Sequence, residues 1–356
     1  MKILTVIGNR PQFIKAAAVS PRLRSEHEEV LVHTGQHFDD ELSSVFFTEL
    51  GLPAPDRELG VALGSNTSQT ARMLSALEPV LRDAVPDAVL VYGDTNSTLA
   101  GALAGAQAGV PVAHVEAGMR SFDRSMPEEL NRVLVDHAAS LLLCSSSVAV
   151  SNLRREGAAG EIELVGDVMV DVALATQPRA RTRLDLVAAR GLEPGQYLLA
   201  TAHRAGNVDA PARLERLVDL LVTMPLPVLF AVHPRTRRRL DELDLLARLE
   251  SCGPVIIAPP LGYLETSALL CNARALLTDS GGLQKEAYLA AVPCLTLRAS
   301  TEWIETVEQG WNVLVDLDAA AALRALEREV PGERPPLYGD GRAGERVLDA
   351  LRLHVG

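Results

Sequence analysis

Residues 277–287 read Leu-Thr-Asp-Ser-Gly-Gly-Leu-Gln-Lys-Glu-Ala, an apolar run that passes through two glycines into a helix-like segment. A strand, a tight turn and a helix in this order form the repeating unit of parallel α/β sheets. Gly281 and Gly282 leave backbone N–H groups open to a phosphate, and Ser280 adds a hydroxyl donor. Glu286 follows about one and a half helical turns later, where its carboxylate can accept two hydrogen bonds from a ribose diol. The stretch predicts a nucleotide-phosphate site, with a ligand-free turn as the alternative.

The same unit recurs along the chain. Short apolar runs are each followed by a longer helix-like segment. They lie at residues 3–7, 30–32, 88–92, 112–115, 140–144, 197–200, 227–232, 255–257, 275–277 and 293–297. Strands that alternate with helices indicate an α/β fold with parallel sheets covered by helices on both faces. Ligands of such sheets bind beyond the carboxyl ends of the strands, so functional residues should directly follow the strands.

The two series of runs are separated by residues 166–186, where a Gly-Asp pair and the stretch PRARTR at 178–183 interrupt the apolar pattern. A chain of 356 residues is long enough for two domains of ordinary size. We therefore expect two Rossmann-like domains, residues 1–168 and 169–337, that face each other across a cleft.

The charge balance restricts the partners. Lys and Arg number 34 and Asp and Glu number 46, so the net charge is 34 − 46 = −12. Nucleic acid and anionic membrane surfaces both require a basic footprint, and we expect neither as a partner. An anionic ligand must instead be held by a few placed cations and by helix N-termini.

The cysteines and the hydropathy indicate the compartment. Cys144, Cys252, Cys271 and Cys294 are widely separated and form no CxxC pair, which argues against a metal site or a disulfide framework. The apolar run at residues 3–7 is too short for a signal peptide. No window of about 18 apolar residues lacks charges and breakers. We expect a cytoplasmic protein without a metal or a membrane span.

The first apolar run leads into GNRPQFIK at residues 8–15. A glycine turn that opens a helix points backbone N–H groups and the positive end of the helix dipole at a ligand, and Arg10 and Lys15 add two cations. The pattern is not G-x-G-x-x-G, so the fingerprint of NAD binding is absent. The alternative is a surface turn with solvated cations.

Three carboxylates follow neighbouring strands of the first half: Asp94, Glu116 and Glu128. Asp94 alone could be a helix N-cap. Glu128 or its neighbour Glu129 could simply favour the positive end of a helix, in whose first turn both lie. Taken together, three acids at one sheet edge predict acid–base chemistry, because crowded carboxyl groups repel and raise one another's pKa.

In the second half, His203 and Arg204 follow one strand, and His233 follows the next. A single histidine at such a position is more often structural than catalytic. Two histidines at matching strand ends, with an arginine beside one of them, make a functional role an equal alternative.

In their order, these motifs resemble those of the non-hydrolysing UDP-N-acetylglucosamine 2-epimerases over essentially the whole chain. The matching stretches are GNRPQFIK at 8–15, TGQH at 34–37, GDT at 93–95, HVEAGMR at 114–120, PEELNR at 127–132, HR at 203–204, DSGGLQKE at 279–286 and TE at 301–302. The resemblance implies the two-domain GT-B fold, with a C-terminal helix at 338–356 that returns to the first domain. It also implies a homodimer, a UDP-sugar substrate and no cofactor.

The resemblance implies a role for each site residue. Asp94, Glu116, Glu128 and His203 correspond to the catalytic acid–base groups. The remaining positions correspond to substrate-binding residues, with a diphosphate set of Arg10, Ser280, Gly281 and Gly282, a ribose-binding acid at Glu286, and further active-site positions at Lys15, Arg132 and His233.

Five positions depart from the family pattern. Asn9 replaces the usual Thr, Gly206 stands where relatives have Glu, and Thr266 falls where many carry a Phe against the uracil. Phe38-Asp39 stands where well-known bacterial members have Arg-Glu, in a segment that those enzymes use to bind a second, activating substrate molecule. In this segment the chain looks closer to archaeal members.

The family chemistry is a C2 epimerisation of UDP-N-acetylglucosamine to UDP-N-acetylmannosamine, through elimination of UDP and its re-addition to a 2-acetamidoglucal. A uronic acid or a 2,3-diacetamido sugar would use the same chemistry. The rival functions are a GT-B glycosyltransferase, a hydrolysing epimerase that releases UDP and free N-acetylmannosamine, and a non-catalytic nucleotide-sugar sensor.

Overall fold

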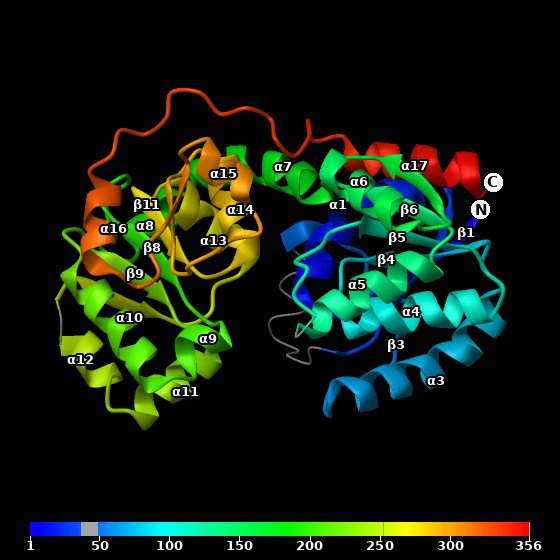
Figure 1. Ribbon diagram of the computed structural model, residues 1–356, viewed down its shortest axis with the longest axis horizontal. Coiled ribbons are helices and arrows are strands. Elements are labelled where there is room, and N and C mark those ends of the chain that lie inside the picture. The colour runs from blue at the N-terminus through cyan, green and yellow to red at the C-terminus, as the bar shows by residue number, and fades with distance from the viewer. Residues whose placement is uncertain (37–48, 125, 252, 356) are drawn as a thin grey trace. The chain divides into compact units, whose positions relative to one another are not determined.

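The structure is a computed structural model that describes residues 1–36, 49–124, 126–251 and 253–355 (Figure 1). The chain forms two compact units, one made of Met1–Val172 with Tyr338–Gly356 and the other of Ala173–Leu337. The first stretch of the first unit ends at Val172, and the sequence-based boundary lies after residue 168. No described helix is long and apolar enough to cross a membrane.

The first unit contains a parallel sheet with the strand order β3-β2-β1-β4-β5-β6-β7 among its described residues. Its strands are β1 Lys2–Ile7, β2 Glu28–His33, β3 Arg57–Glu58, β4 Ala88–Tyr92, β5 Val112–Ala117, β6 Leu141–Cys144 and β7 Glu161–Leu164. Its helices are α1 Arg10–Glu26, α3 Asn66–Ala84, α4 Asn96–Gln107, α5 Pro127–Ala138, α6 Ser147–Glu156 and α17 Ala343–His354. The register pairs Leu4 with Val30 on one side and with Val89 on the other.

Helices cover both faces of this sheet, as Figure 1 shows for α17 on one face and α3, α4 and α5 on the other. The central strand β4 is consequently buried along its whole length. Burial on both faces explains why the central strands read as continuous apolar runs instead of alternating ones. The predicted α/β class with parallel sheets is confirmed.

The second unit contains a parallel sheet in the order β10-β9-β8-β11-β12-β13. Its strands are β8 Leu198–Thr201, β9 Val228–Ala231, β10 Val255–Ala258, β11 Ala275–Thr278, β12 Cys294–Thr296 and β13 Asn312–Leu314. Its helices are α8 Leu184–Ala188, α9 Ala205–Val208, α10 Pro211–Thr223, α11 Pro234–Glu242, α12 Leu246–Ser251, α13 Tyr263–Cys271, α14 Gly281–Ala290, α15 Ile304–Glu308 and α16 Ala319–Leu326. One core cluster packs α10 and α16 on the sheet, and another packs α13 and α14 on it.

The division between the units falls inside helix α7, Val168–Thr182. In its first turn, Asp171 accepts hydrogen bonds from the backbone N–H groups of Ala343 (3.0 Å) and Gly344 (2.8 Å). These are the first two residues of α17, so Asp171 satisfies two N–H groups that a helix start leaves without an intrahelical partner. The Cα of Gly344 lies against the backbone of Ala18 in α1, which brings the end of the chain onto the first helix.

Candidate active site

The turn after β1 is held by Gln12, which is 1% exposed. Its side-chain carbonyl accepts from the backbone N–H of Gly8 (2.7 Å), and its amide donates to the carbonyl of Tyr92 (2.9 Å). Asn9 caps α1 by accepting from the N–H of Gln12 (3.2 Å). Arg10 is the first residue of α1 and is half-buried. The predicted anion-binding turn is thus fixed to the end of β4, where the first predicted carboxylate follows.

That carboxylate, Asp94, is paired with Arg132 of α5. The guanidinium donates to Asp94 Oδ2 from Nε at 2.9 Å and from Nη2 at 2.6 Å. Asn131 donates to the backbone carbonyl of Asp94 (2.9 Å). Burial alone would lower the pKa of Arg132, but Asp94 and Glu129 raise it.

Glu116, near the end of β5, forms an ion pair with Lys15 of α1. Lys15 is 8% exposed. Burial lowers its pKa, but the charges of Glu116 and Asp94 raise it by a larger amount, so that the pKa lies above its usual value. Glu116 has a positive φ of 75°. Asp94 and Glu116 thus each have a cation beside them, and the sequence alone did not predict these two pairings.

The neighbouring acids of α5 differ in environment. Glu128 is exposed in the first turn of the helix. Glu129 is 4% exposed and accepts from the backbone N–H groups of Ser121 (2.8 Å) and Phe122 (2.9 Å), and from Arg132 (2.9 Å). Burial would raise the pKa of Glu129, but these hydrogen bonds lower it. Glu129 therefore has the structural role that the sequence allowed for either residue.

In the second unit, the two histidines are adjacent. The ring centroids of His203 and His233 are 5.8 Å apart. His203 follows β8, and its Nδ1 lies 3.3 Å from Oδ1 of the fully buried Asp279. Asp279 also accepts from the backbone N–H of His203 (3.1 Å) and of Arg204 (3.0 Å). Asp279, the first residue of the DSGG motif, thus fixes the turn that bears His203 at the end of the neighbouring strand β8.

The Ser-Gly-Gly turn begins helix α14. Ser280 is its N-cap, and Gly281 and Gly282 are its first two residues. Trp303 Nε1 donates to the carbonyl of Gly281 (2.8 Å). Gly282 is exposed, and a Cβ added there would be 3.9 Å from the nearest atom, Ser280 Oγ. Glu286 is 9% exposed.

An acid that carried no predicted role adjoins this turn. Glu302 lies against Gly281, so that a Cβ on that glycine would overlap its carboxylate. Arg298 (2.8 Å) and Arg204 (3.3 Å) pair with Glu302. Burial raises the pKa of Glu302, but Arg298, a backbone hydrogen bond and Arg204 together lower it by more.

The structure separates the predicted residues by unit. The first unit brings together Arg10, Lys15, Asp94, Glu116, Glu128 and Arg132 at the ends of β1, β4 and β5 and the start of α5. The second unit gathers His203, His233, Ser280, Gly281, Gly282 and Glu286 at the ends of β8, β9 and β11 and in α14. The supporting side chains Gln12, Asn131 and Asp279 had no predicted role, because their contacts with Tyr92, Asp94 and His203 are long-range and no sequence spacing shows them.

The departures from the family pattern lie in contrasting places. Gly206 is exposed in α9, and Thr266 is buried in α13. Of the TGQH motif, Gln36 accepts from the backbone N–H and the hydroxyl of Ser97. Phe38-Asp39 lies outside the described residues.

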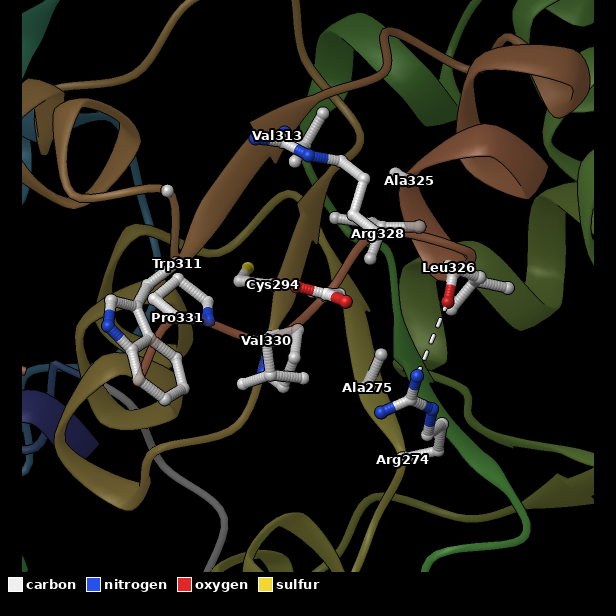
Figure 2. A pocket seen from close by; sticks show the side chains of 14 residues that line it. Arg274, Ala275, Cys294, Trp311, Val313, Ala325, Leu326, Arg328, Val330 and Pro331 are labelled. Atoms are coloured by element: carbon white, nitrogen blue, oxygen red, sulfur yellow. Dashed lines mark hydrogen bonds between the residues drawn. The ribbon is translucent and has the colours of Figure 1, made fainter. Parts of the chain in front are cut away.

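A pocket in the second unit is separate from these residues. Figure 2 shows it between Arg274, Cys294, Trp311 and Val330. Cys294 begins β12, and Arg274 directly precedes β11, so the pocket lies at the amino ends of the strands. The candidate site residues follow the carboxyl ends of the strands, at the opposite edge of the sheet.

Comparison with known proteins gives consistent matches. A protein-family model described as UDP-N-acetylglucosamine 2-epimerase matches residues 22–352. A Methanococcus maripaludis UDP-N-acetylglucosamine 2-epimerase homolog is 44% identical over 99% of each chain. A Pseudomonas aeruginosa UDP-2,3-diacetamido-2,3-dideoxy-D-glucuronate 2-epimerase is 45% identical over 99% of each chain. The crystal structure of Methanocaldococcus jannaschii UDP-GlcNAc 2-epimerase in complex with UDP-GlcNAc and UDP matches with a TM-score of 0.90 at 40% identity, over 99% of this chain and 100% of that one.

Proposed function

Because the chain belongs to the UDP-N-acetylglucosamine 2-epimerase family, we propose that it interconverts UDP-N-acetylglucosamine and UDP-N-acetylmannosamine. The observation that carries this proposal is the set of carboxylates on the neighbouring strand ends of β4 and β5, where Asp94 pairs with Arg132 and Glu116 with Lys15. A nucleotide-binding protein that left the sugar unchanged would not need a set of acids at this edge.

The proposed chemistry is an elimination followed by an addition. A base removes the C2 proton, the C1–O bond breaks, and UDP leaves with the bonding pair, which gives a 2-acetamidoglucal. An acid then returns a proton to the opposite face of C2, and a UDP oxygen re-forms the bond to C1. No step of this elimination and addition transfers a hydride, so the proposed chemistry needs no redox cofactor.

We assign proton transfer to Asp94, Glu116 and Glu128, with His203 as a further acid–base group. Positioned carboxylates are suited to this step because the C2 proton is only weakly acidic. Lys15 and Arg132 hold two of the carboxylates in place and are assigned to substrate binding as well.

We assign the UDP portion to the predicted binding set. Backbone N–H groups at the start of α14 can stabilise the charge that grows on the leaving diphosphate. The residues assigned to the diphosphate are Arg10, Ser280, Gly281 and Gly282. Glu286 would accept hydrogen bonds from the ribose, and His233 completes the set.

A second candidate substrate is favoured by one comparison. The Pseudomonas aeruginosa relative named for a UDP-2,3-diacetamido glucuronate is about as similar to this chain as the Methanococcus maripaludis homolog is. The same C2 chemistry would act on that sugar. Parallel assays with both UDP-sugars therefore decide which substrate is epimerised faster.

The chemistry is tested by running the reaction in D₂O with UDP-N-acetylglucosamine and no acceptor. We expect a product with inverted C2 that contains deuterium at C2 and retains hydrogen at C1, together with intact UDP-sugar by NMR. Release of free N-acetylmannosamine would indicate the hydrolysing reaction instead. Unchanged C2 with each UDP-sugar tested would contradict the proposal and favour a glycosyltransferase or a sensor.

The assigned acids are tested by the variants Asp94→Asn, Glu116→Gln and Glu128→Gln. General acid–base catalysis contributes roughly 100- to 10,000-fold to a rate. We expect at least two of the three variants to lose activity in this range while still binding UDP in calorimetry. The matched control is Glu78→Gln, an exposed acid of α3, which should keep full activity. Near-normal turnover in all three variants would make the assignment wrong.

The predicted homodimer and the predicted cytoplasmic location remain predictions. Light scattering after size-exclusion chromatography measures the mass in solution, and a mass near twice the 38.1 kDa of one chain is the expected result.

A further inference from the structure

His114, in the middle of β5, is 1% exposed and has no role in the chemistry above. Its Nε2 lies 2.7 Å from the backbone carbonyl oxygen of Gly93, and its Nδ1 lies 2.7 Å from Oδ1 of Asp136 in α5. A carbonyl oxygen only accepts hydrogen bonds, so Nε2 must be the donor of the first. The second bond decides the charge of the ring.

Asp136 is fully buried and is surrounded by donors. Its Oδ2 accepts from the backbone N–H of Gly118 (3.0 Å) and from Arg120 Nη1 (2.7 Å). A guanidinium and a backbone N–H that both donate to Oδ2 favour an ionised carboxylate, and the pKa of Asp136 is lowered although burial raises it. His114 Nδ1 must then donate as well, and a ring that donates from both nitrogens is an imidazolium.

We propose that His114 is a positioning residue that fixes the two turns bearing Asp94 and Glu116. This inference rests on the proposed function, because it gives those acids their geometry. The imidazolium holds the carbonyl of Gly93, directly before Asp94. Its partner Asp136 holds the N–H of Gly118, two residues after Glu116.

The packing around Gly93 supports this coupling. Gly93 has a φ of 65°, and a Cβ there would lie 2.9 Å from Lys15 Nζ and 3.4 Å from Glu116 Oε2. The backbone that His114 holds is thus in contact with the ion pair of the neighbouring turn. A shift at Gly93 would displace Asp94 and the Lys15–Glu116 pair together.

The charges around the ring are balanced. Arg120 extends from Asp136 to Glu156 of α6, to which it donates two hydrogen bonds at 2.9 Å and 2.7 Å. Burial would raise the pKa of Asp136, but His114 and Arg120 lower it. The pKa of the Cys144 thiol in β6 is raised to about 12, chiefly by burial and further by the negative charge of Asp136. The cations His114 and Arg120 are thus balanced by the anions Asp136 and Glu156, and the thiol is neutral. Because the group has no net charge, a buried imidazolium is tolerable.

The charge state is tested directly in the wild-type protein labelled with ¹⁵N-histidine. His114→Gln identifies the signal, and His137→Gln, an exposed histidine of α5, is the matched control. We expect both ring nitrogens of His114 to carry protons at pH 7, because each of them faces an acceptor oxygen. A neutral ring at pH 7 would overturn the proposal. This measurement is independent of whether any UDP-sugar is epimerised.

The positioning role is tested with kinetics. We expect His114→Gln to lower kcat by roughly tenfold or more with little change in KM, because displaced acids slow the chemistry while the UDP contacts remain. Asp136→Asn removes the negative charge beside the His114 ring. As the pH rises, the kcat of this variant should therefore begin to fall at a lower pH than the kcat of the wild type. Wild-type kcat in His114→Gln, or identical pH profiles for Asp136→Asn and the wild type, would overturn the role. If no variant and no wild type epimerises any UDP-sugar, the proposed function fails, and the NMR result still decides the charge of His114.

Discussion

At the scale of single residues, Glu128 and Glu129 show how far a sequence can distinguish two equal side chains. Both stand in the first turn of α5, where an acid favours the helix dipole. Only the folded chain shows that Glu129 faces inward to the loop at Ser121 while Glu128 is exposed. The direction of a side chain at a helix start depends on the preceding loop, which the local pattern does not encode.

This difference predicts effects of unequal size from the same substitution. Glu129→Gln should lower the free energy of unfolding by about 1–3 kcal/mol, because buried donors lose a charged acceptor. Glu128→Gln should change it by less than about 0.5 kcal/mol. The folded-state pKa of Glu129 is lowered, so its contribution is present above the unfolded value of 4.5 and is lost as the pH falls through the folded-state pKa. Urea unfolding at pH 7 and near pH 3 measures both effects, and equal stabilities of the two variants at pH 7 would contradict the assignment.

Glu286 is the second prediction at this scale. Glu286→Gln keeps the shape of the side chain but removes the charge from its hydrogen bonds to a ribose, each worth roughly 1.5–3 kcal/mol. UDP affinity in calorimetry should therefore fall by about tenfold or more. Glu265→Gln, an acid of the neighbouring helix α13 that pairs with Arg190, is the control. Equal UDP affinity in Glu286→Gln and the wild type would remove Glu286 from the site.

At the scale of elements, the sequence predicts the central strands and misses three edge strands. β3, β7 and β13 each lie at an edge of their sheet. β7 reads Glu-Ile-Glu-Leu with both glutamates and Leu164 substantially accessible, so it lacks the continuous apolar run of a strand buried on both faces. β3 is two residues long, which no periodicity can identify. The carboxyl ends of the predicted strands are sufficient to locate the candidate site.

The start of α14 gives a prediction for an element. In Gly282→Ala the added methyl group meets open space, and Ala is the better helix former by up to about 1 kcal/mol. We expect thermal stability to be kept or raised while UDP affinity falls by about tenfold, since the methyl group would block the approach of a phosphate. In Gly281→Ala the methyl group overlaps Glu302, so stability should fall as well. Undiminished UDP binding by Gly282→Ala would place the phosphates elsewhere.

At the scale of the whole molecule, the fold is the GT-B-like fold of the family, with two parallel α/β sheets. Two features of the first unit are hard to read from sequence. Its last helix, α17, comes from the far end of the chain, and its cap Asp171 precedes that helix by 172 residues, since 343 − 171 = 172. Local spacing contains no signal for such a pair, and only the family resemblance predicted the return of the helix.

The long-range cap gives a prediction at this scale. Asp171→Ala removes two acceptors from the start of α17 and should lower the free energy of unfolding of the first unit by about 1–2 kcal/mol. Asp349→Ala, an exposed acid on the same helix, should cost less than about 0.5 kcal/mol. Hydrogen exchange of α17 amides reports the local effect, and equal protection of α17 in the two variants would contradict the capping role.

The return of α17 to α1 also sets the order in which the protein can be completed during synthesis. The ribosome finishes Ala173–Leu337 as one uninterrupted stretch, whereas the unit that begins at Met1 needs residues made after Tyr338. At the usual elongation rate of roughly 5–20 residues per second, translation proceeds for about 10–40 s between Val172 and the last turn of α17. During that interval the nascent α1 has no partner for the surface that α17 covers. The domain that is translated first is therefore the one that is completed last.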